Sequence, residues 1–270
     1  MNLGIQYWFR HSLRVIAALI CILFLGLPAL RAAEIEVDLE LVIAVDVSSS
    51  MDLDEQMVQR SGYVGAFSDP IVTNAIRSGL FGRIALTYVE WADSRHQTVI
   101  MPWRLIDSDE SARKFAAELN TKPLILGNGT SISNGLLFAS RLFDRNGFEA
   151  TRRVIDISGD GPNTLGPHVT KARDAVVEAG VVINGLPLII HPQPSGYETQ
   201  PDLADYYHDC VIGGSGAFVA PANSIEEIAS TIRRKLIQEI ASNPSPVVKV
   251  AVFEPQTKAD CTIGQKDFNE

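Results

Sequence analysis

The segment Leu41–Met51, with the sequence LVIAVDVSSSM, contains the clearest strand pattern and the first candidate site residues. Its opening run of five apolar residues, without polar alternation, is typical of a strand buried on both faces of a parallel sheet. The run ends at Asp46, and the hydroxyl side chains of Ser48 and Ser50 follow. Because open α/β sheets usually bind ligands at the carboxyl ends of their strands, the segment predicts a strand that leads into a binding loop.

The side chains of this loop favour a hard divalent cation. Asp46, Ser48 and Ser50 offer one carboxylate and two hydroxyl oxygens, with no cysteine or histidine nearby. Oxygen ligands of this kind suit Mg²⁺, Mn²⁺ or Ca²⁺ better than zinc. We therefore interpret the loop as the first half of a metal site, with Mg²⁺ as the expected ion.

Residues 1–33 have the layout of a secretory signal peptide. Arg10 and Arg14 precede an apolar run over residues 15–25, and the small residues Ala32–Ala33 follow. That run is shorter than the roughly 20 residues that a membrane-spanning helix requires. We expect cleavage and export to the periplasm or the medium of a bacterium, with no membrane insertion afterwards. An uncleaved signal anchor is the alternative.

Removal of this leader would leave a strongly acidic chain. It would carry 20 basic and 32 acidic side chains, a net charge of −12. Such a charge argues against nucleic acid and anionic membrane surfaces as partners, because both would repel the protein. Cations and basic protein surfaces remain compatible with it.

Two cysteines, Cys210 and Cys261, would remain after cleavage. A pair of cysteines in an exported protein favours a disulfide, with two free thiols as the alternative. A disulfide would attach the C-terminal tail, residues 243–270, to the rest of the chain.

Strand and helix patterns alternate over residues 34–242, which predicts one doubly wound α/β domain with a mostly parallel, six-stranded sheet. Prolines after residue 243 break any further helix and leave residues 243–270 as a tail. The expected strands are 39–45, 84–91, 98–103, 153–157, 181–188 and 217–219, and the helices between and after them include 107–119, 132–143, 170–179, 203–207 and 224–240.

Two further strand-end loops carry oxygen side chains. Thr130 follows Gly-Asn-Gly before a helix, and Asp160 lies in Ser-Gly-Asp-Gly after a strand. With Asp46, Ser48 and Ser50, they form the order D-x-S-x-S, threonine, aspartate. This order resembles the metal-ion-dependent adhesion site of von Willebrand factor A domains, and the resemblance covers about residues 39–240.

The resemblance implies a fold, a set of ion ligands and a function. Ser48, Ser50 and Thr130 would supply hydroxyl oxygens, while Asp46 and Asp160 would bind the ion directly or through water. An acidic side chain of a partner protein would then complete the coordination. The implied function is an exported, divalent-cation-dependent protein-binding domain for adhesion or assembly, and not an enzyme.

A narrower resemblance is to a bacterial family of exported A-like domains of unknown function. It depends on two segments. They are VIDISGDGPN at residues 154–163 and YYHDCVIGGSGAF at residues 206–218.

Each candidate ligand also has an ordinary structural interpretation. Ser48, Ser50 and Thr130 could cap helices, and Asp46 and Asp160 could cap turns. The roles of two nearby residues, Ser131 and Asp156, are also left as alternatives. Ser131 could partly substitute for Thr130, and Asp156, inside a strand, is expected to make either a buried structural hydrogen bond or a contact with the Asp46 loop.

Two other functions are considered. In the first, the ion only stabilises the loops of a structural component of the envelope. In the second, Ser215 in Gly-Gly-Ser-Gly serves as the nucleophile of a hydrolase, although a nucleophile elbow requires a helix where the pattern after Ser215 favours a strand. A phosphoryl-accepting role for Asp46 is disfavoured, because Ser48 stands where such enzymes need a second acid.

Overall fold

The computed structural model describes residues 33–190, 202–241 and 259–265 of the 270-residue chain. The predicted signal peptide and most of the predicted tail lie outside these ranges. The chain divides into Met1–Glu34 and Ile35–Glu270, and the domain described below belongs to the second unit. Within the described ranges, no helix has the length and apolarity needed to cross a bilayer.

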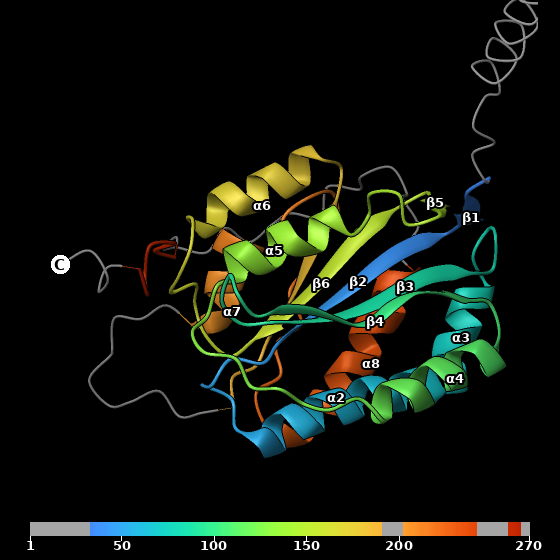
Figure 1. The fold of residues 1–270 in the computed structure, drawn as a ribbon, viewed down its shortest axis with the longest axis horizontal. Helices are drawn as coiled ribbons and strands as arrows, with labels where there is room; N and C mark the ends of the chain where they lie inside the picture. Colours follow the sequence, from blue (N-terminus) through green and yellow to red (C-terminus); the bar gives the residue numbers. More distant parts are fainter. Residues whose placement is uncertain (1–32, 191–201, 242–258, 266–270) are drawn as a thin grey trace, which may run out of the picture. The chain divides into compact units, whose positions relative to one another are not determined.

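A five-stranded sheet forms the centre of the domain (Figure 1). Its neighbouring strands are parallel except for one antiparallel pair, β3 with β4 at the edge. A small second sheet pairs β1 (Ile35–Val37) with β5 (Phe148–Ala150). In spatial order the main strands are β4 (Gln97–Ile106), β3 (Ile84–Trp91), β2 (Leu39–Asp46), β6 (Arg153–Gly159) and β7 (Val182–Pro187).

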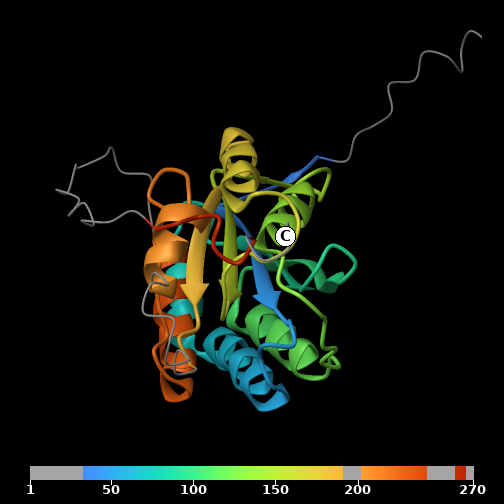
Figure 2. The same cartoon turned by 90° about the vertical axis from the view of Figure 1, so that its left-hand side faces the viewer.

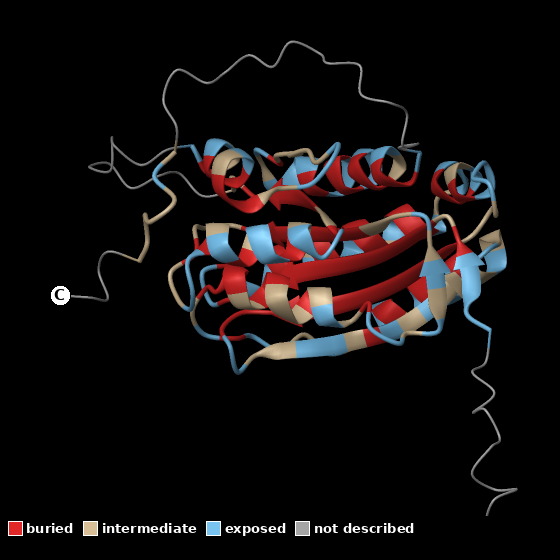
Figure 3. Ribbon diagram, turned by 90° about the horizontal axis from the view of Figure 1, so that it is seen from above, coloured by how far each residue is buried: buried red, intermediate tan, exposed pale blue. Residues whose placement is uncertain are grey.

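Helices cover both faces of this sheet, so β2, β3 and β6 are buried between two layers, whereas most residues of the edge strand β4 are exposed or half-buried (Figure 3). Successive residues of β2 face opposite sides: Leu41 and Ile43 belong to one core cluster, while Val42 and Ala44 belong to the other. The doubly wound α/β fold is therefore confirmed. One face carries α2 (Leu53–Ser68), α3 (Pro70–Arg77), α4 (Asp109–Asn120) and α8 (Ile225–Ala241), and the other carries α5 (Ile132–Arg141), α6 (Val169–Glu178) and α7 (Leu203–Tyr206), which continues as the π-helix η1 (Tyr207–Val211).

The expected sixth strand at 217–219 is wrong, because this segment makes a single isolated bridge with β7, between Val219 and Gly185. The amide of Gly185 donates to Phe218 O at 3.0 Å, and the amide of Ala220 donates back to Gly185 O at 2.9 Å. The next donor in this parallel pattern is residue 187. Pro187 has no N–H group, so the ladder is interrupted there.

Asp156, in the middle of β6, belongs to a buried polar cluster under α8. The Nζ of Lys235 lies 2.6 Å from Asp156 Oδ1 and also contacts Glu239, one turn further along the helix. Glu239 accepts a hydrogen bond from Asn184 Nδ2 at 2.9 Å. The pairing explains how a carboxylate is tolerated inside a strand. Of the two roles considered for Asp156, the structure gives it the structural one.

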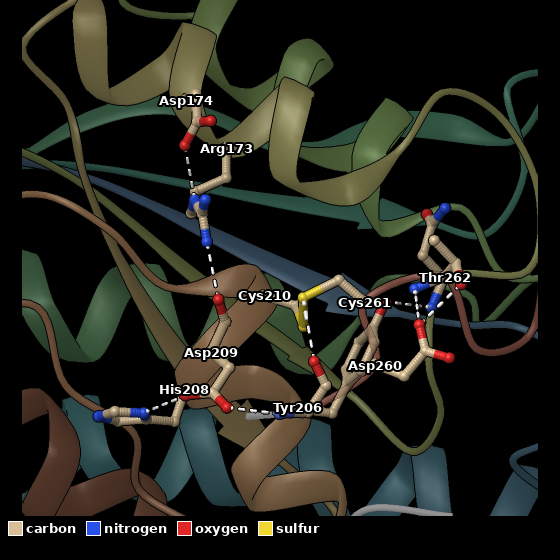
Figure 4. Close-up of a disulfide and its surroundings, with 11 residues drawn as sticks. Arg173, Asp174, Tyr206, His208, Asp209, Cys210, Asp260, Cys261 and Thr262 are labelled. Atoms are coloured by element: carbon tan, nitrogen blue, oxygen red, sulfur yellow. Dashed lines mark hydrogen bonds and ion pairs between the residues drawn. A yellow bond between two sulfur atoms is a disulfide. The ribbon is translucent and has the colours of Figure 1, made fainter. Parts of the chain in front are cut away.

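The disulfide expected between Cys210 and Cys261 is present, with the two Cα atoms 5.4 Å apart (Figure 4). Cys210 lies in η1, on the face of the sheet that α5 and α6 cover. The side chain of Gln265 donates to Gly166 O at 3.0 Å. Residues 259–265 are thus attached both to η1 and to the loop that follows β6.

Candidate metal centre

Asp46 is the last residue of β2 and lies against the end of β6. Val45 pairs with Ser158, so the next residues along the two parallel strands, Asp46 and Gly159, are neighbours. A Cβ atom at Gly159 would lie 2.9 Å from Asp46 Oδ2, closer than real Cβ atoms approach other atoms. A larger residue at this position would therefore force the Asp46 carboxylate to shift. Figure 2 is viewed from the side of the domain where the carboxyl ends of both strands lie.

A chain of hydrogen bonds joins four of the five predicted ligands. The backbone amide of Ser48 donates to Asp46 Oδ1 at 2.7 Å, which is the turn-forming role considered for this aspartate. The hydroxyls of Ser48 and Ser50 lie 2.9 Å apart. Ser50 Oγ in turn donates to Asp160 Oδ1 at 2.8 Å. The structure thus brings together side chains that are more than 100 residues apart in the sequence.

Thr130 lies in the loop between α4 and α5, and backbone hydrogen bonds hold this loop between the other two. On one side, the amide of Gly127 donates to Val47 O at 2.8 Å. On the other side, Thr130 O accepts from the amides of Thr164 and Leu165 at 2.9 and 3.0 Å. The loops after β2 and β6 therefore both contact the Thr130 loop. The role of the Thr130 hydroxyl as an ion ligand stays a prediction.

The helix caps beside these loops are made by other residues. Asp52 caps α2, and its side chain accepts a hydrogen bond from the amide of Glu55 at 2.9 Å. Ser131 caps α5, so its hydroxyl is already engaged there. The interpretation of Ser50 and Thr130 as helix caps is therefore wrong, and a cap does not account for either hydroxyl.

The surroundings of Asp46 make its negative charge costly. Burial and the nearby carboxylate of Asp160 together raise the pKa of Asp46 to about 8. Its Oδ2 is buried and has no hydrogen-bond partner among the described residues. A cation would satisfy this oxygen and offset the repulsion between the two carboxylates. The donor set therefore fits a hard divalent ion.

Hydroxyl groups are essential to this fit. Among the described residues, no three or more His, Cys, Asp or Glu side chains gather in a way that could hold a metal ion. The candidate centre contains only two carboxylates, Asp46 and Asp160. Its capacity for an ion thus depends on Ser48, Ser50 and Thr130 as additional oxygen donors.

Asn163, Tyr206 and Tyr207 lie beside the candidate centre, and their contacts could not be predicted from the sequence. Asn163 follows Gly-Pro, a sequence typical of a turn, yet it is completely buried. Its Oδ1 accepts a hydrogen bond from the amide of Ser133 at 3.0 Å, and its own amide donates to Tyr206 Oη at 3.1 Å. Tyr207 reaches the same region from η1. These residues lie in the two segments of the narrower resemblance, 154–163 and 206–218, to which the sequence alone assigned no such contacts.

Ser215, considered as a nucleophile, does not lie at a strand-to-helix turn. It is exposed between Gly214 and Gly216, whose φ angles are 95° and 77°. An isolated bridge between Val219 and Gly185 follows it, where an elbow would have a helix. The absence of enzymatic activity itself stays a prediction.

The strand order, the two helical layers and the three loops at one edge of the sheet define a von Willebrand A-like α/β domain, as the sequence predicted. The chain belongs to a family described as protein of unknown function (DUF1194), whose model matches residues 36–244. The narrower resemblance to a family of unknown function is thereby confirmed. A comparison with curated proteins finds none that matches.

Solved structures with a similar fold include two from unrelated sources. One is proximal thread matrix protein 1 from the mussel byssus with a zinc-occupied MIDAS motif, with 13% identity, a TM-score of 0.53, and coverage of 77% of this chain and 47% of that chain. Another is the pilus adhesin SpaC from Lactobacillus rhamnosus GG, with 11% identity, a TM-score of 0.53, and coverage of 76% and 30%. The chain thus spans about half of the mussel protein and less than a third of the adhesin. At these identities the likeness shows the fold alone.

Proposed function

We propose that this chain is an exported protein-binding domain, for adhesion or assembly, that captures an acidic side chain of a partner through a divalent cation. Asp46, Ser48, Ser50, Thr130 and Asp160 would hold the ion, and Mg²⁺ is the expected species. The observation that carries the proposal is the hydrogen-bonded chain from Asp46 to Asp160 at the carboxyl edge of the sheet. The ion would supply positive charge at a position that a partner can reach.

The exposure of the candidate ligands supports access from one side. Asp46 and Ser48 are buried, whereas Ser50 is exposed and Asp160 is half-buried. The two carboxylates and the three neutral hydroxyls would supply five oxygens, one fewer than the octahedron of Mg²⁺ requires. A coordination position on the exposed side would therefore suit an anionic oxygen from another protein.

Large apolar side chains are exposed close to this side. Leu53 and Met57, one turn apart on α2, are 47% and 44% exposed. Ile125 and Leu126, in the loop that leads to Thr130, are 54% and 49% exposed. We call these four side chains the apolar rim.

Hydrogen bonds place the two halves of the apolar rim near each other. Arg60 of α2 donates to Lys122 O at 2.6 Å, and the loop then runs to Gly127, which bonds to Val47. Residues 125 and 126 lie between these attachments, so the loop follows the first turns of α2. This arrangement supports a partner segment in which the acidic residue is flanked by large apolar side chains.

The likeness in fold to the mussel matrix protein and to the pilus adhesin supports the adhesion or assembly class. The name of the mussel structure states a zinc-occupied MIDAS motif, and SpaC is named as a pilus adhesin. Export to a periplasm or beyond is part of the proposal, since the predicted leader and the disulfide both suit that location.

The proposal is tested by capture with controlled metal content. Immobilised mature protein is incubated with envelope extract in Mg²⁺, in excess chelator, and in chelator followed by excess Mg²⁺. We expect the same partner to be captured in the first and third conditions and lost in the second. Equal capture in chelator would contradict the proposal. A melting temperature raised by Mg²⁺, without any captured partner, would favour the structural alternative.

A charge placed in the apolar rim should weaken capture without affecting the ion. For Leu126→Asp, we expect at least a roughly tenfold lower affinity for the captured partner, because apolar contact is lost and a like charge meets an acidic segment. The affinity for Mn²⁺ should stay the same. Both are measured by isothermal titration calorimetry. Leu80→Asp is the matched control, because Leu80 is 84% exposed before β3, at the opposite end of the strands.

A further inference from the structure

Two buried polar atoms converge at Gly159. Asp46 Oδ2 and Tyr207 Oη are both buried, and neither has a hydrogen-bond partner among the described residues. A Cβ atom at Gly159 would lie 2.9 Å from the first and 2.8 Å from the second. The two oxygens therefore flank the same point, close enough for one water molecule to bridge them.

The backbone places Tyr207 firmly at this point. Tyr207 begins η1, and π-helical turns often occur at functional sites. Its ring packs against a second glycine of the sheet, since a Cβ atom at Gly185 would lie 2.7 Å from Tyr207 Cδ1. The preceding Tyr206 bonds to the loop after β6, and Cys210 is held by the disulfide. The phenol is thus fixed between the ends of β6 and β7.

The hydroxyl of Tyr207 is a hydrogen-bond donor at neutral pH. Burial, together with the carboxylates of Asp46 and Asp160, raises the pKa of Tyr207 well above its usual value. A buried donor without an acceptor destabilises the folded state. Asp46 Oδ2, on the same side of the sheet, is a buried acceptor that has no hydrogen-bond donor among the described residues.

We infer that Tyr207 is a further residue of the proposed metal centre, whose hydroxyl donates a hydrogen bond to Asp46 Oδ2, directly or through one water molecule, when the ion is bound. It acts as a positioning residue that fixes how the Asp46 carboxylate faces the ion. The inference rests on the proposed metal site, and it is independent of which partner is captured.

The test compares ion affinity with the stability of the metal-free protein. For Tyr207→Phe in the mature chain, we expect a Mn²⁺ affinity about 10–100-fold lower, the usual effect of losing a group that orients a metal ligand. The metal-free melting temperature should be unchanged or higher, because the variant loses only an unpaired hydroxyl. Free Mn²⁺ is measured by electron paramagnetic resonance and melting by calorimetry.

Two further variants sharpen the test. Tyr88→Phe is the matched control, since Tyr88 also has a buried hydroxyl without a hydrogen-bond partner among the described residues, in the other core cluster. It should bind Mn²⁺ like the parent. Gly159→Ala inserts a methyl group between Asp46 and Tyr207 and should reproduce the loss of affinity with both side chains present.

Each outcome decides the inference. A Tyr207→Phe protein that binds Mn²⁺ within about twofold of the parent overturns it, because the usual loss is 10–100-fold. A loss of affinity accompanied by a lower metal-free melting temperature also overturns it, since Tyr207 would then act through the fold. A parent protein that does not bind Mn²⁺ overturns both the inference and the proposed function. Mn²⁺ binding without partner capture contradicts the proposed function alone.

Discussion

The Asp160→Ala protein is expected to fold like the parent and to lose both divalent-ion binding and ion-dependent capture. Asp160 is half-buried and accepts a hydrogen bond from Ser50 at the surface of the centre, so its truncation removes no core packing. It does remove one of only two carboxylates. We expect the Mn²⁺ affinity to fall by at least about 100-fold, equivalent to about 2.7 kcal/mol. Isothermal titration calorimetry measures it, with circular dichroism to verify the fold.

The control for this variant removes an acidic side chain elsewhere. Asp174→Ala on α6 eliminates one exposed carboxylate that pairs with Arg173, and it should bind Mn²⁺ like the parent. Asp46→Ala should behave like Asp160→Ala. Retained capture in both Asp46→Ala and Asp160→Ala would falsify the assignment of the metal centre.

Lys235→Met is expected to be the most destabilising single change in the buried cluster under α8. Lys235 is the partner of two buried carboxylates, Asp156 and Glu239. Burial lowers the pKa of Lys235, but these carboxylates outweigh burial, so the net shift is upward. Removing one member of such a buried group leaves uncompensated charge and typically costs about 3–5 kcal/mol of the free energy of unfolding. Urea denaturation at pH 7.5 measures the loss.

The loss in Lys235→Met should depend on pH. Burial and the charge of Asp156 raise the pKa of Glu239 to about 7 from 4.5. Between pH 4.5 and about 7, Glu239 therefore keeps its proton in the folded state and loses it in the unfolded state. The resulting stabilisation is present below pH 4.5 and is lost as the pH rises through 7. The variant should therefore lose less at pH 5 than at pH 7.5.

A fully neutral version of the cluster is the control. Asp156→Asn, Lys235→Met and Glu239→Gln combined remove every charge and should recover most of the stability that Lys235→Met loses. An equal loss in the single and triple variants at both pH values would show that side-chain packing, and not charge, determines the effect.

The central strands could be predicted from the sequence because their burial leaves an unbroken apolar pattern. The expected strand 84–91 coincides with β3, and 39–45 differs from β2 by one residue. In contrast, β1 and β5 have three residues each, which is too short to show any period. The expected strand at 217–219 has apolar residues, but its hydrogen bonding depends on Pro187 in a different segment, so its local pattern could not indicate the interruption.

The candidate centre was only partly predictable for a similar reason. Asp46, Ser48 and Ser50 lie close in sequence, and their order with Thr130 and Asp160 indicates a site. The contribution of Tyr207 depends on how β2 and β6 pair and on the space that Gly159 leaves between them. No local sequence pattern indicates the space between two strands, and nothing in the residues around Tyr207 predicts a contact with Asp46.

The covalent link between Cys210 and Cys261 has a mechanical consequence for a domain under tension. A pull applied to the chain beyond Cys261 is transmitted through the sulfur atoms directly to η1. The intervening polypeptide, α8 included, forms a closed loop that carries none of this load while the link is intact. Force from the C-terminal end therefore enters the domain next to Tyr207 and not through the last helix.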